Sequence, residues 1–268
     1  MADQTEIAWT DSTFNPWIGC TKISPGCDNC YAATLAARYG WVRWGKHPRH
    51  RTSEANWKKP RTWNADGPRF RSVHGRRRRV FCASLADVFD NRAPKEWRAD
   101  LFALIRATPE LDWQILTKRP QNMPKMLPAD WADGYSNVWL GTTSEDEKHY
   151  RMRWPVLSEI PAVRRFISYE PALGSLGELA ITDTLPDWII SGGESGPFAR
   201  VMNPLWAYQV RDQCKALGVA FFHKQWGTYG SNPTVWAGAS RGEARAHDPP
   251  SNGKGGGLLG RRLYRSFP

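Results

Sequence analysis

The chain has 268 residues, and its 41% hydrophobic and 24% charged content excludes a disordered or fibrous protein. Lys and Arg number 37 against 26 Asp and Glu, a net charge of +11 that favours an anionic partner. No run of about 18 apolar residues is present, so we expect no membrane-spanning helix. The polar, acidic N-terminus is unlike a secretory signal, and we therefore expect a cytoplasmic protein.

The first predicted strand lies near residues 14–17 and is followed by three closely spaced cysteines. Cys20, Cys27 and Cys30 have the spacing C-x6-C-x2-C, and an Ala-rich helical pattern over 32–39 follows at once. If Asp28 caps that helix, Cys27 and Cys30 lie at its positive end, where the helix dipole favours a thiolate. Three cysteines within eleven residues indicate a metal site rather than a disulfide framework.

Two kinds of metal site fit these thiols. Three thiolates hold three irons of a [4Fe–4S] cluster and leave the fourth iron open, whereas a closed electron-transfer cluster needs a fourth cysteine. The alternative is a zinc site that a histidine or an aspartate completes, with His47, His50 and His74 available. The cluster is favoured because no second pair of close ligands follows. The other two cysteines, Cys82 and Cys214, fit small core positions.

Residues 41–79 form a basic insertion between the first and second predicted strands. The insertion holds 13 Lys and Arg against two acidic residues, with four Trp interleaved. Aromatic side chains next to cations are how proteins hold single strands and flipped bases. The insertion therefore predicts nucleic-acid contact through Trp41, Trp44, Arg76, Arg77, Arg78 and Arg79.

Beyond residue 79, short apolar runs alternate with helical patterns, which indicates a parallel α/β sheet. Helices are expected over 95–107 and 203–217. The count predicts a full or partial (β/α) barrel of six to seven parallel strands over residues 1–237, with 238–268 as a flexible tail rich in Gly and Arg. The strands are expected at 80–84, 113–116, 137–140, 165–168, 188–190 and 219–222.

Polar residues follow these strands, where a barrel keeps its active site; a doubly wound sheet would place them there too. The cations among them suit an anionic substrate such as a nucleotide phosphate. The run Gly192-Gly193-Glu194 fits either a ligand loop or a tight turn. The candidates at the strand ends are Ser84, Asp87, Lys118, Arg119, Thr142, Thr143, Ser144, Glu170, Glu194 and Lys224.

A three-cysteine loop after the first strand of an α/β barrel resembles the radical SAM superfamily, whose usual first gap is three residues rather than six. From about residue 14 to 227 the chain also looks like a phage-encoded family of unknown function. That second resemblance is carried by Phe14-Asn-Pro-Trp17, the cysteine stretch, Leu116-Thr-Lys-Arg-Pro120, Val138-Trp-Leu-Gly141, Ser168-Tyr-Glu-Pro171, Gly192-Gly-Glu-Ser-Gly196 and Lys224-Gln-Trp-Gly227.

The superfamily resemblance implies an iron–sulfur enzyme with a [4Fe–4S] cluster on Cys20, Cys27 and Cys30. S-adenosylmethionine would bind the open iron, and an external one-electron reductant would generate a 5′-deoxyadenosyl radical that abstracts hydrogen from a substrate. By position, Ser84 and Asp87 would meet the methionine amino group, and Thr142, Thr143 and Ser144 the ribose or carboxylate. Glu170, Glu194 and Lys224 are the candidate catalytic residues, and Cys82, Cys214 and Tyr169 are candidates to quench a product radical.

With the positive charge, this resemblance predicts nucleic acid or a nucleotide as the substrate. Base modification or lesion repair would be the reaction, similar to that of spore photoproduct lyase, in the cytoplasm of a bacterium or a phage-infected host. One alternative is a zinc-binding nucleic-acid-binding protein without catalysis. Another is a radical SAM enzyme that acts on a peptide or a small metabolite. The sequence leaves the oligomeric state open.

Overall fold

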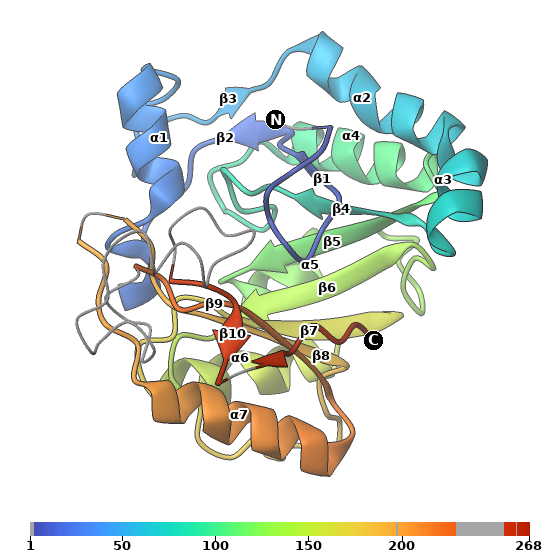
Figure 1. Cartoon of the computed structure of the whole chain (residues 1–268). Helices are drawn as coiled ribbons and strands as arrows, with labels where there is room; N and C mark the ends of the chain where they lie inside the picture. Colours follow the sequence, from blue (N-terminus) through green and yellow to red (C-terminus); the bar gives the residue numbers. More distant parts are fainter. Residues whose placement is uncertain (1–2, 197, 229–254, 261) are drawn as a thin grey trace. The chain divides into compact units, whose positions relative to one another are not determined.

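A computed structural model describes residues 3–196, 198–228, 255–260 and 262–268. Seven strands form one parallel sheet with helices between them, and the predicted α/β partial barrel is confirmed (Figure 1). No helix in these ranges is long and apolar enough to cross a membrane. The strands, in sheet order, are β1 (Ser12–Phe14), β4 (Arg78–Cys82), β5 (Leu111–Thr117), β6 (Val138–Thr143), β7 (Arg164–Tyr169), β8 (Trp188–Gly192) and β9 (Ala220–Gln225).

The chain divides into two compact units. The first holds Met1–Ile23, Ala32–Gly141 and Glu159–Val163, and the second holds the remaining residues. The short segment Ser24–Tyr31 belongs to the second unit although both of its flanks belong to the first. Cys20 is thus part of the first unit, while Cys27 and Cys30 are part of the second.

In the first unit, β1, β4 and β5 carry the core. β4 pairs with both neighbours, and Phe14 packs edge-on against Trp57 and Trp113 with ring centroids 5.6 Å apart in each case. Each of these rings is less than a tenth exposed. Around this core lie the ribbon β2 (Trp17–Ile18) with β3 (His50–Arg51), and the helices α1 (Tyr31–Tyr39), α2 (Glu54–Ala65), α3 (Gly67–His74), α4 (Lys95–Arg106) and α5 (Met123–Met126), with the 3-10 turn η2 (Pro120–Asn122).

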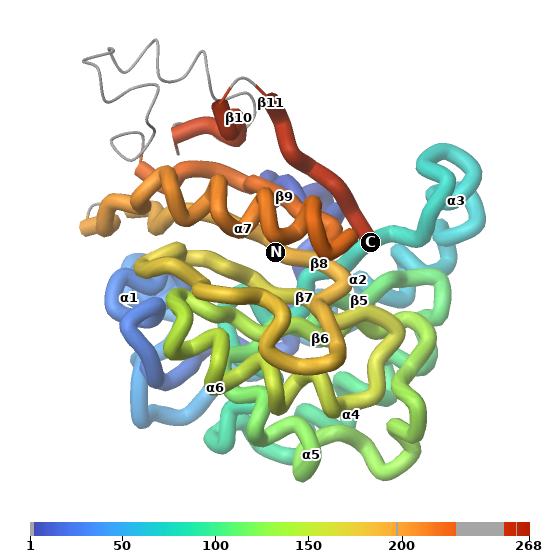
Figure 2. Tube along the Cα trace, turned by 90° about the horizontal axis from the view of Figure 1, so that it is seen from below, coloured from blue at the N-terminus to red at the C-terminus, as the bar shows by residue number. Residues whose placement is uncertain are grey.

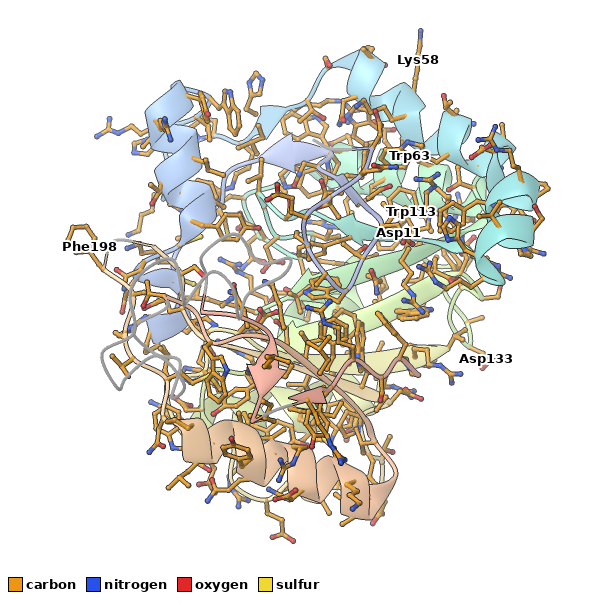
Figure 3. All side chains as sticks on the ribbon, in the orientation of Figure 1. Asp11, Lys58, Trp63, Trp113, Asp133 and Phe198 are labelled. Carbon is orange, nitrogen blue, oxygen red and sulfur yellow. The ribbon has the colours of Figure 1, made fainter. Side chains whose placement is uncertain are left out.

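The predicted insertion contains two helices of the core rather than an open basic surface. Ser53 caps α2 by accepting from the Asn56 N–H, and α3 ends at Gly75 in the left-handed conformation that glycine favours. Lys58 projects outward from α2, whereas Trp63 is only 6% exposed on its inner side (Figure 3). Trp57 is buried too, so half of the Trp residues of the insertion pack in the core.

The run Arg76 to Arg79, predicted to contact nucleic acid, makes contacts within the fold. Strand β4 begins at Arg78, so the run leads directly into the sheet. Arg76 pairs with Asp11 at 2.6 Å, Arg77 with Asp112 at 3.4 Å and Arg78 with Asp66 at 3.7 Å. Burial lowers the pKa of Arg79, which packs over the Trp139 ring, to about 10. All four arginines therefore form ion pairs or aromatic ring contacts within the fold.

In the second unit, β7, β8 and β9 pair in parallel and two helices pack on them. α6 (Glu147–Ser158) contacts β7, and α7 (Pro204–Leu217) contacts β8 and β9 (Figure 2). α7 starts and ends as predicted, because Asn203 caps its N-terminus and Gly218 ends it in the left-handed region. One row across the strands holds Tyr169, Ser191 and His223 in register.

The described part of the segment predicted as a flexible tail packs on the second unit. Residues 238–254 lie outside the described residues. β10 (Leu258–Leu259) and β11 (Arg262–Leu263) form a hairpin, and Arg265 bridges to Phe222 of β9. The Trp188 indole donates to the Ser266 carbonyl at 2.9 Å and the Trp226 indole donates to the Leu258 carbonyl at 2.7 Å. Residues 255–268 therefore belong to the folded unit wherever they are described.

Candidate functional site

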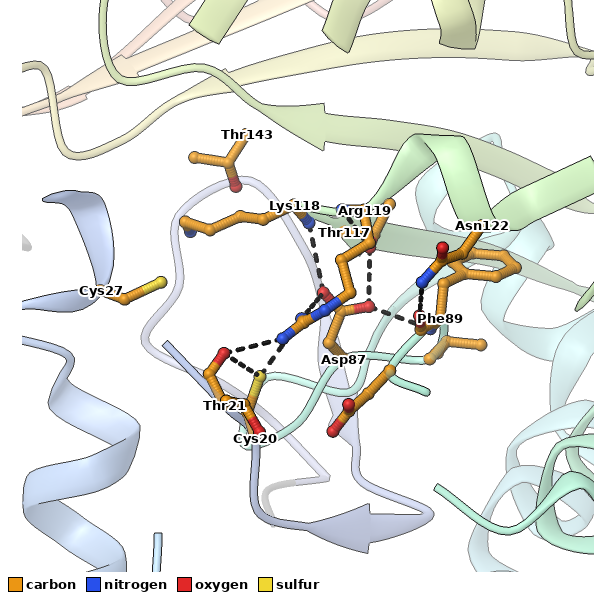
Figure 4. A network of polar contacts seen from close by, with 12 residues as sticks. Cys20, Thr21, Cys27, Asp87, Phe89, Thr117, Lys118, Arg119, Asn122 and Thr143 are labelled. Atoms are coloured by element: carbon orange, nitrogen blue, oxygen red, sulfur yellow. Dashed lines mark hydrogen bonds and ion pairs between the residues drawn. The ribbon is translucent and has the colours of Figure 1, made fainter. Parts of the chain in front are cut away.

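Cys20 lies two residues beyond β2 and is held by a buried arginine. Arg119 donates from Nη1 to the Cys20 sulfur at 3.5 Å and from Nη2 to the Thr21 carbonyl at 2.7 Å (Figure 4). Burial raises the pKa of the Cys20 thiol to about 12, and the Asp87 carboxylate adds to the rise while Arg119 opposes it. Without a metal, the Cys20 thiol is therefore protonated at neutral pH.

Arg119 and Asp87 form a buried ion pair behind this thiol. Their side chains are 6% and 7% exposed, with 2.8 Å between Nη1 and Oδ2. Asp87 also accepts from the Thr117 hydroxyl at 2.6 Å and from the backbone N–H groups of Phe89 and Lys118 (Figure 4). Arg119 was predicted as a cation for an anionic substrate; in the structure its guanidinium is buried and bound by Asp87, the Cys20 sulfur and the Thr21 carbonyl. Asp87 has four donors of its own, which leaves little room for a cofactor amino group.

The other predicted cofactor residues are distributed over both units. Ser84 exchanges hydrogen bonds with the Asn15 amide in the first unit, at 2.9 and 3.3 Å. Thr142, Thr143 and Ser144 follow one another in the second unit and are at most 1% exposed. Within the described ranges, the Ser144 hydroxyl has no hydrogen-bond partner.

The segment Ser24–Tyr31 carries the other two cysteines. Cys27 ends the 3-10 turn η1 (Pro25–Cys27), and α1 begins directly after Cys30, two residues later than a cap at Asp28 would place it. The Cys27 sulfur lies 3.9 Å from the Ser24 hydroxyl. Cys20, Cys27 and Cys30 are all half-buried thiols and none takes part in a disulfide.

Glu145 anchors the start of this segment. The Ser24 hydroxyl donates to Glu145 Oε1, and Arg153 donates to Oε2 at 2.7 Å. A Cβ on Gly26 would lie 2.5 Å from Glu145 Oε1, so a residue larger than glycine displaces either the turn or the carboxylate. Glu145 is fully buried. A charge without solvent contact is stable only when it is paired, and Arg153 supplies that pair.

Glu194 anchors the other end. Asn29 donates to Glu194 Oε2 at 3.0 Å, and Arg200 donates to both oxygens. Arg200 also donates from Nη2 to the Pro25 carbonyl at 2.8 Å and pairs with Asp28 at 3.4 Å. Burial alone would raise the pKa of Glu194, but the hydrogen bonds from Arg200 and Asn29 hold it below the ordinary value. In this geometry Glu194 positions the cysteine segment, and its catalytic role stays a prediction.

We name Glu145, Glu194 and Arg200 the loop clamp, because together they hold the segment on both sides of Cys27. Sequence reasoning assigned no role to Glu145, Arg153, Arg200 or Asn29. A role for Glu145 could have been predicted from the sequence, since this residue ends the polar run that follows a predicted strand. No sequence pattern predicts the role of Arg200, because its partners Pro25 and Asp28 lie more than 170 residues away in the chain.

Glu170 and Lys224, two predicted catalytic residues, are brought together as an ion pair. Lys224 Nζ lies 2.8 Å from Glu170 Oε1. The glycines beside them serve close packing: a Cβ on Gly192 would lie 2.7 Å from Glu170 Oε1, and one on Gly193 would overlap the Trp226 carbonyl. The Gly-Gly pair therefore has a packing role in a tight arrangement of β8 and β9.

The three candidates for quenching a radical are buried. Cys82 and Cys214 have no solvent exposure, and burial raises the pKa of both thiols, that of Cys214 to about 12. Burial also raises the pKa of Tyr169, whose hydroxyl donates to the Gly174 carbonyl. Both cysteines occupy the core positions expected from the sequence.

Among the described residues, no three or more His, Cys, Asp and Glu side chains are grouped so as to hold a metal ion. The donor chemistry itself suits a soft metal, since three half-buried thiols occur within one short stretch. The histidines of the zinc alternative lie apart in the fold, His50 in β3 and His74 at the end of α3, where its ring packs on Phe70. The assignment of a metal therefore depends on the cysteine spacing along the chain.

Comparison with protein families matches residues 4–266 to a family described as Protein of unknown function (DUF5131). Searches of curated proteins and of solved structures returned no match. Because the family match spans nearly the whole chain, the chain belongs to the family Protein of unknown function (DUF5131).

Proposed function

We propose that this protein is a radical SAM-type iron–sulfur enzyme that acts on nucleic acid or a nucleotide. The observation that carries the proposal is the set of three half-buried thiols, Cys20, Cys27 and Cys30, early in an α/β partial barrel. Three thiolates match a [4Fe–4S] cluster with one open iron, and a closed cluster would need a fourth. The resemblance to the radical SAM superfamily names S-adenosylmethionine as the ligand of that iron.

When bound, the cluster and S-adenosylmethionine would supply the carbon radical that abstracts hydrogen from the substrate. The residues of the chain hold and tune this group. Arg119 donates to the Cys20 sulfur, and hydrogen bonds to ligand sulfurs are one of the means by which proteins set a cluster's reduction potential. The loop clamp fixes the backbone around Cys27.

Of the predicted S-adenosylmethionine contacts, Ser144 has the strongest support. Its hydroxyl is buried and lacks a partner in the described part of the chain, so a polar ligand group would satisfy it. The Glu170–Lys224 pair is a candidate for holding a proton or an anionic substrate group near the strand ends. An external one-electron reductant and a reducing cytoplasm complete the proposal.

Anaerobic purification, metal analysis and an absorption spectrum test the cofactor. We expect a brown protein with about four irons per chain and absorption near 400 nm that S-adenosylmethionine alters. Cys30→Ala should lose the iron, while Cys214→Ala, a change at a core cysteine away from the motif, should keep it. A colourless protein with one zinc would overturn the proposal in favour of a zinc-binding, non-catalytic protein.

A second measurement tests the substrate class. With the cluster loaded, we expect cleavage of S-adenosylmethionine to rise when nucleic acid is added, because substrate-bound enzyme consumes the radical productively. If nucleic acid has no effect while the cluster is intact, the substrate proposal fails. A peptide or a small metabolite would then take its place.

A further inference from the structure

Two aromatic rings stack on each other at the surface where α1 ends. Tyr39 is the last residue of α1, and Trp41 follows after one glycine. Their ring centroids are 4.9 Å apart with an interplanar angle of 19°. Tyr39 is 56% exposed and Trp41 is 40% exposed. Large aromatic side chains usually bury their surface, so an exposed stacked pair indicates a binding surface.

Cations flank this pair along the chain. The Arg38 guanidinium lies 5.7 Å from the Tyr39 ring centroid, and Arg43 and Lys46 are exposed on the segment that follows. The sequence has no Asp or Glu between residues 29 and 53. Within the described residues, the ion pairs of this stretch join Arg49 to Asp90 and Arg51 to Asp100.

Arg38, Arg43 and Lys46 form no ion pair with any described acid, in contrast to the run Arg76 to Arg79. We name Arg38, Tyr39, Trp41, Arg43 and Lys46 the aromatic–cation surface. All five residues belong to the first unit. The structure thus separates the basic insertion into arginines that stabilise the fold and a neighbouring surface whose charges remain available to an anionic ligand.

We propose that the aromatic–cation surface binds single-stranded nucleic acid. Unpaired bases would stack on the Tyr39–Trp41 pair, and the three cations would contact the backbone phosphates. A single strand is favoured over a duplex because the base faces of a duplex are already stacked on one another. The proposal rests on the proposed function for its substrate class and assigns that substrate a place on the protein.

Fluorescence anisotropy with the full chain tests this surface, with fluorescein-labelled dT20 and a matched duplex as the two probes. We expect the wild type to bind dT20 more tightly than the duplex at low salt. Trp41→Ala should weaken dT20 binding by about 5-fold to 150-fold, since stacking of one base is worth about 1–3 kcal/mol. Replacing Arg38, Arg43 and Lys46 with Ser should reduce the slope of log K against log salt by about 2.

Two control variants match these changes elsewhere in the first unit. Lys58→Ser removes one exposed cation from α2, and Val73→Ala trims a side chain that is 70% exposed on α3. Both should bind dT20 as the wild type does. Circular dichroism of every variant confirms that the helices are retained.

The outcomes separate this proposal from the proposed function. If the wild type does not bind dT20, or if Tyr39→Ala and Trp41→Ala bind it with unchanged affinity, the proposed role of the aromatic–cation surface is refuted. This holds whether or not the protein contains iron. If dT20 binding depends on both rings but the protein holds zinc, the aromatic–cation surface is supported as a binding site for single-stranded nucleic acid. The proposal of a radical SAM-type enzyme is then refuted. Tighter binding of the duplex than of dT20 also contradicts the proposal.

Discussion

Arg200 donates to both carboxylate oxygens of Glu194, from Nη2 to Oε1 at 2.6 Å and from Nε to Oε2 at 2.9 Å. The same guanidinium reaches the Pro25 carbonyl, so one side chain ties the end of β8 to the turn before Cys27. A planar guanidinium is suited to this task because its donors have a fixed geometry. The pair therefore controls the conformation of a cysteine segment distant in sequence.

Arg200→Gln should release the segment around Cys27. Charge-assisted hydrogen bonds contribute about 1.5–3 kcal/mol, and because the Arg200 side chain is 38% exposed we expect the lower end. Alkylation of Cys27 in the metal-free protein should accelerate about tenfold. The measurement is mass spectrometry of the peptide after timed reaction with iodoacetamide.

Two internal comparisons control that experiment. Cys20 belongs to the other unit and should react at an unchanged rate. Arg151→Gln breaks an exposed pair with Glu147 on α6 and should leave the Cys27 rate unaltered. Equal rates for Cys27 in Arg200→Gln and in the wild type would refute the clamp.

Replacing Arg119 alone should strongly destabilise the first unit. Arg119→Met leaves the buried Asp87 carboxylate without its cation, which costs about 3–5 kcal/mol for a buried pair. The double variant with Asp87→Asn should recover part of that loss, because no unpaired charge remains and the amide oxygen can still accept from Thr117 and Phe89. Urea denaturation of the wild type, both single variants and the double variant measures this cycle, and a double variant no more stable than Arg119→Met would contradict it.

His223 should make the second unit less stable in mild acid. Burial lowers the pKa of His223 to about 3, and Arg265 contributes, while an unfolded histidine titrates near 6.5. Below pH 6.5 the unfolded chain takes up a proton that the folded chain refuses. The free energy of unfolding therefore falls as pH drops toward 3, by about 2 kcal/mol between pH 6.5 and 5.

Urea unfolding at pH 7 and pH 5 checks the histidine prediction, with His223→Gln as the reference. The wild type should lose more stability than the variant over this interval, because glutamine has no proton to gain. Equal losses would show that the acid sensitivity comes from other groups.

Gly193→Ala should disrupt the packing between β8 and the turn after β9. Its Cβ would overlap the Trp226 carbonyl, which is backbone and moves only with the chain. We expect a loss of about 3 kcal/mol, the upper end for overpacking. Gly174→Ala is the matched control, since its Cβ would lie 3.1 Å from an Asp146 side-chain atom that can adjust. A similar melting temperature for both variants would contradict this reading.

The repeating pattern of strands and helices was readable from the sequence because each element carries its own local signal. The helix from Pro204 to Leu217 is an example, with its cap, proline and terminal glycine all in place. The partners of Arg76 to Arg79, in contrast, could not be predicted from the sequence. Asp11 and Asp112 come close only after β1, β4 and β5 pair, and no local pattern announces such a contact.

The candidate site shows the same division. The cysteine spacing and the positions of Glu170 and Lys224 after strands follow from local sequence, and these two side chains do meet. The loop clamp depends on a loop, two strand ends and Arg200 converging in space. A buried carboxylate such as Glu145 looks the same in sequence as a solvent-exposed one, because burial is a property of the whole fold.

The bridge between Phe222 and Arg265 has a consequence for self-association. β9 is the last strand of the sheet, and an open edge offers unpaired backbone groups to another chain. The His223 N–H donates to the Tyr264 carbonyl, and the Ser266 N–H donates to the Phe221 carbonyl, so the final residues occupy that edge. The C-terminal residues thus cover the open edge of β9. A chain truncated after Gly260 would leave the backbone groups of β9 unpaired and able to bond to a strand of another chain.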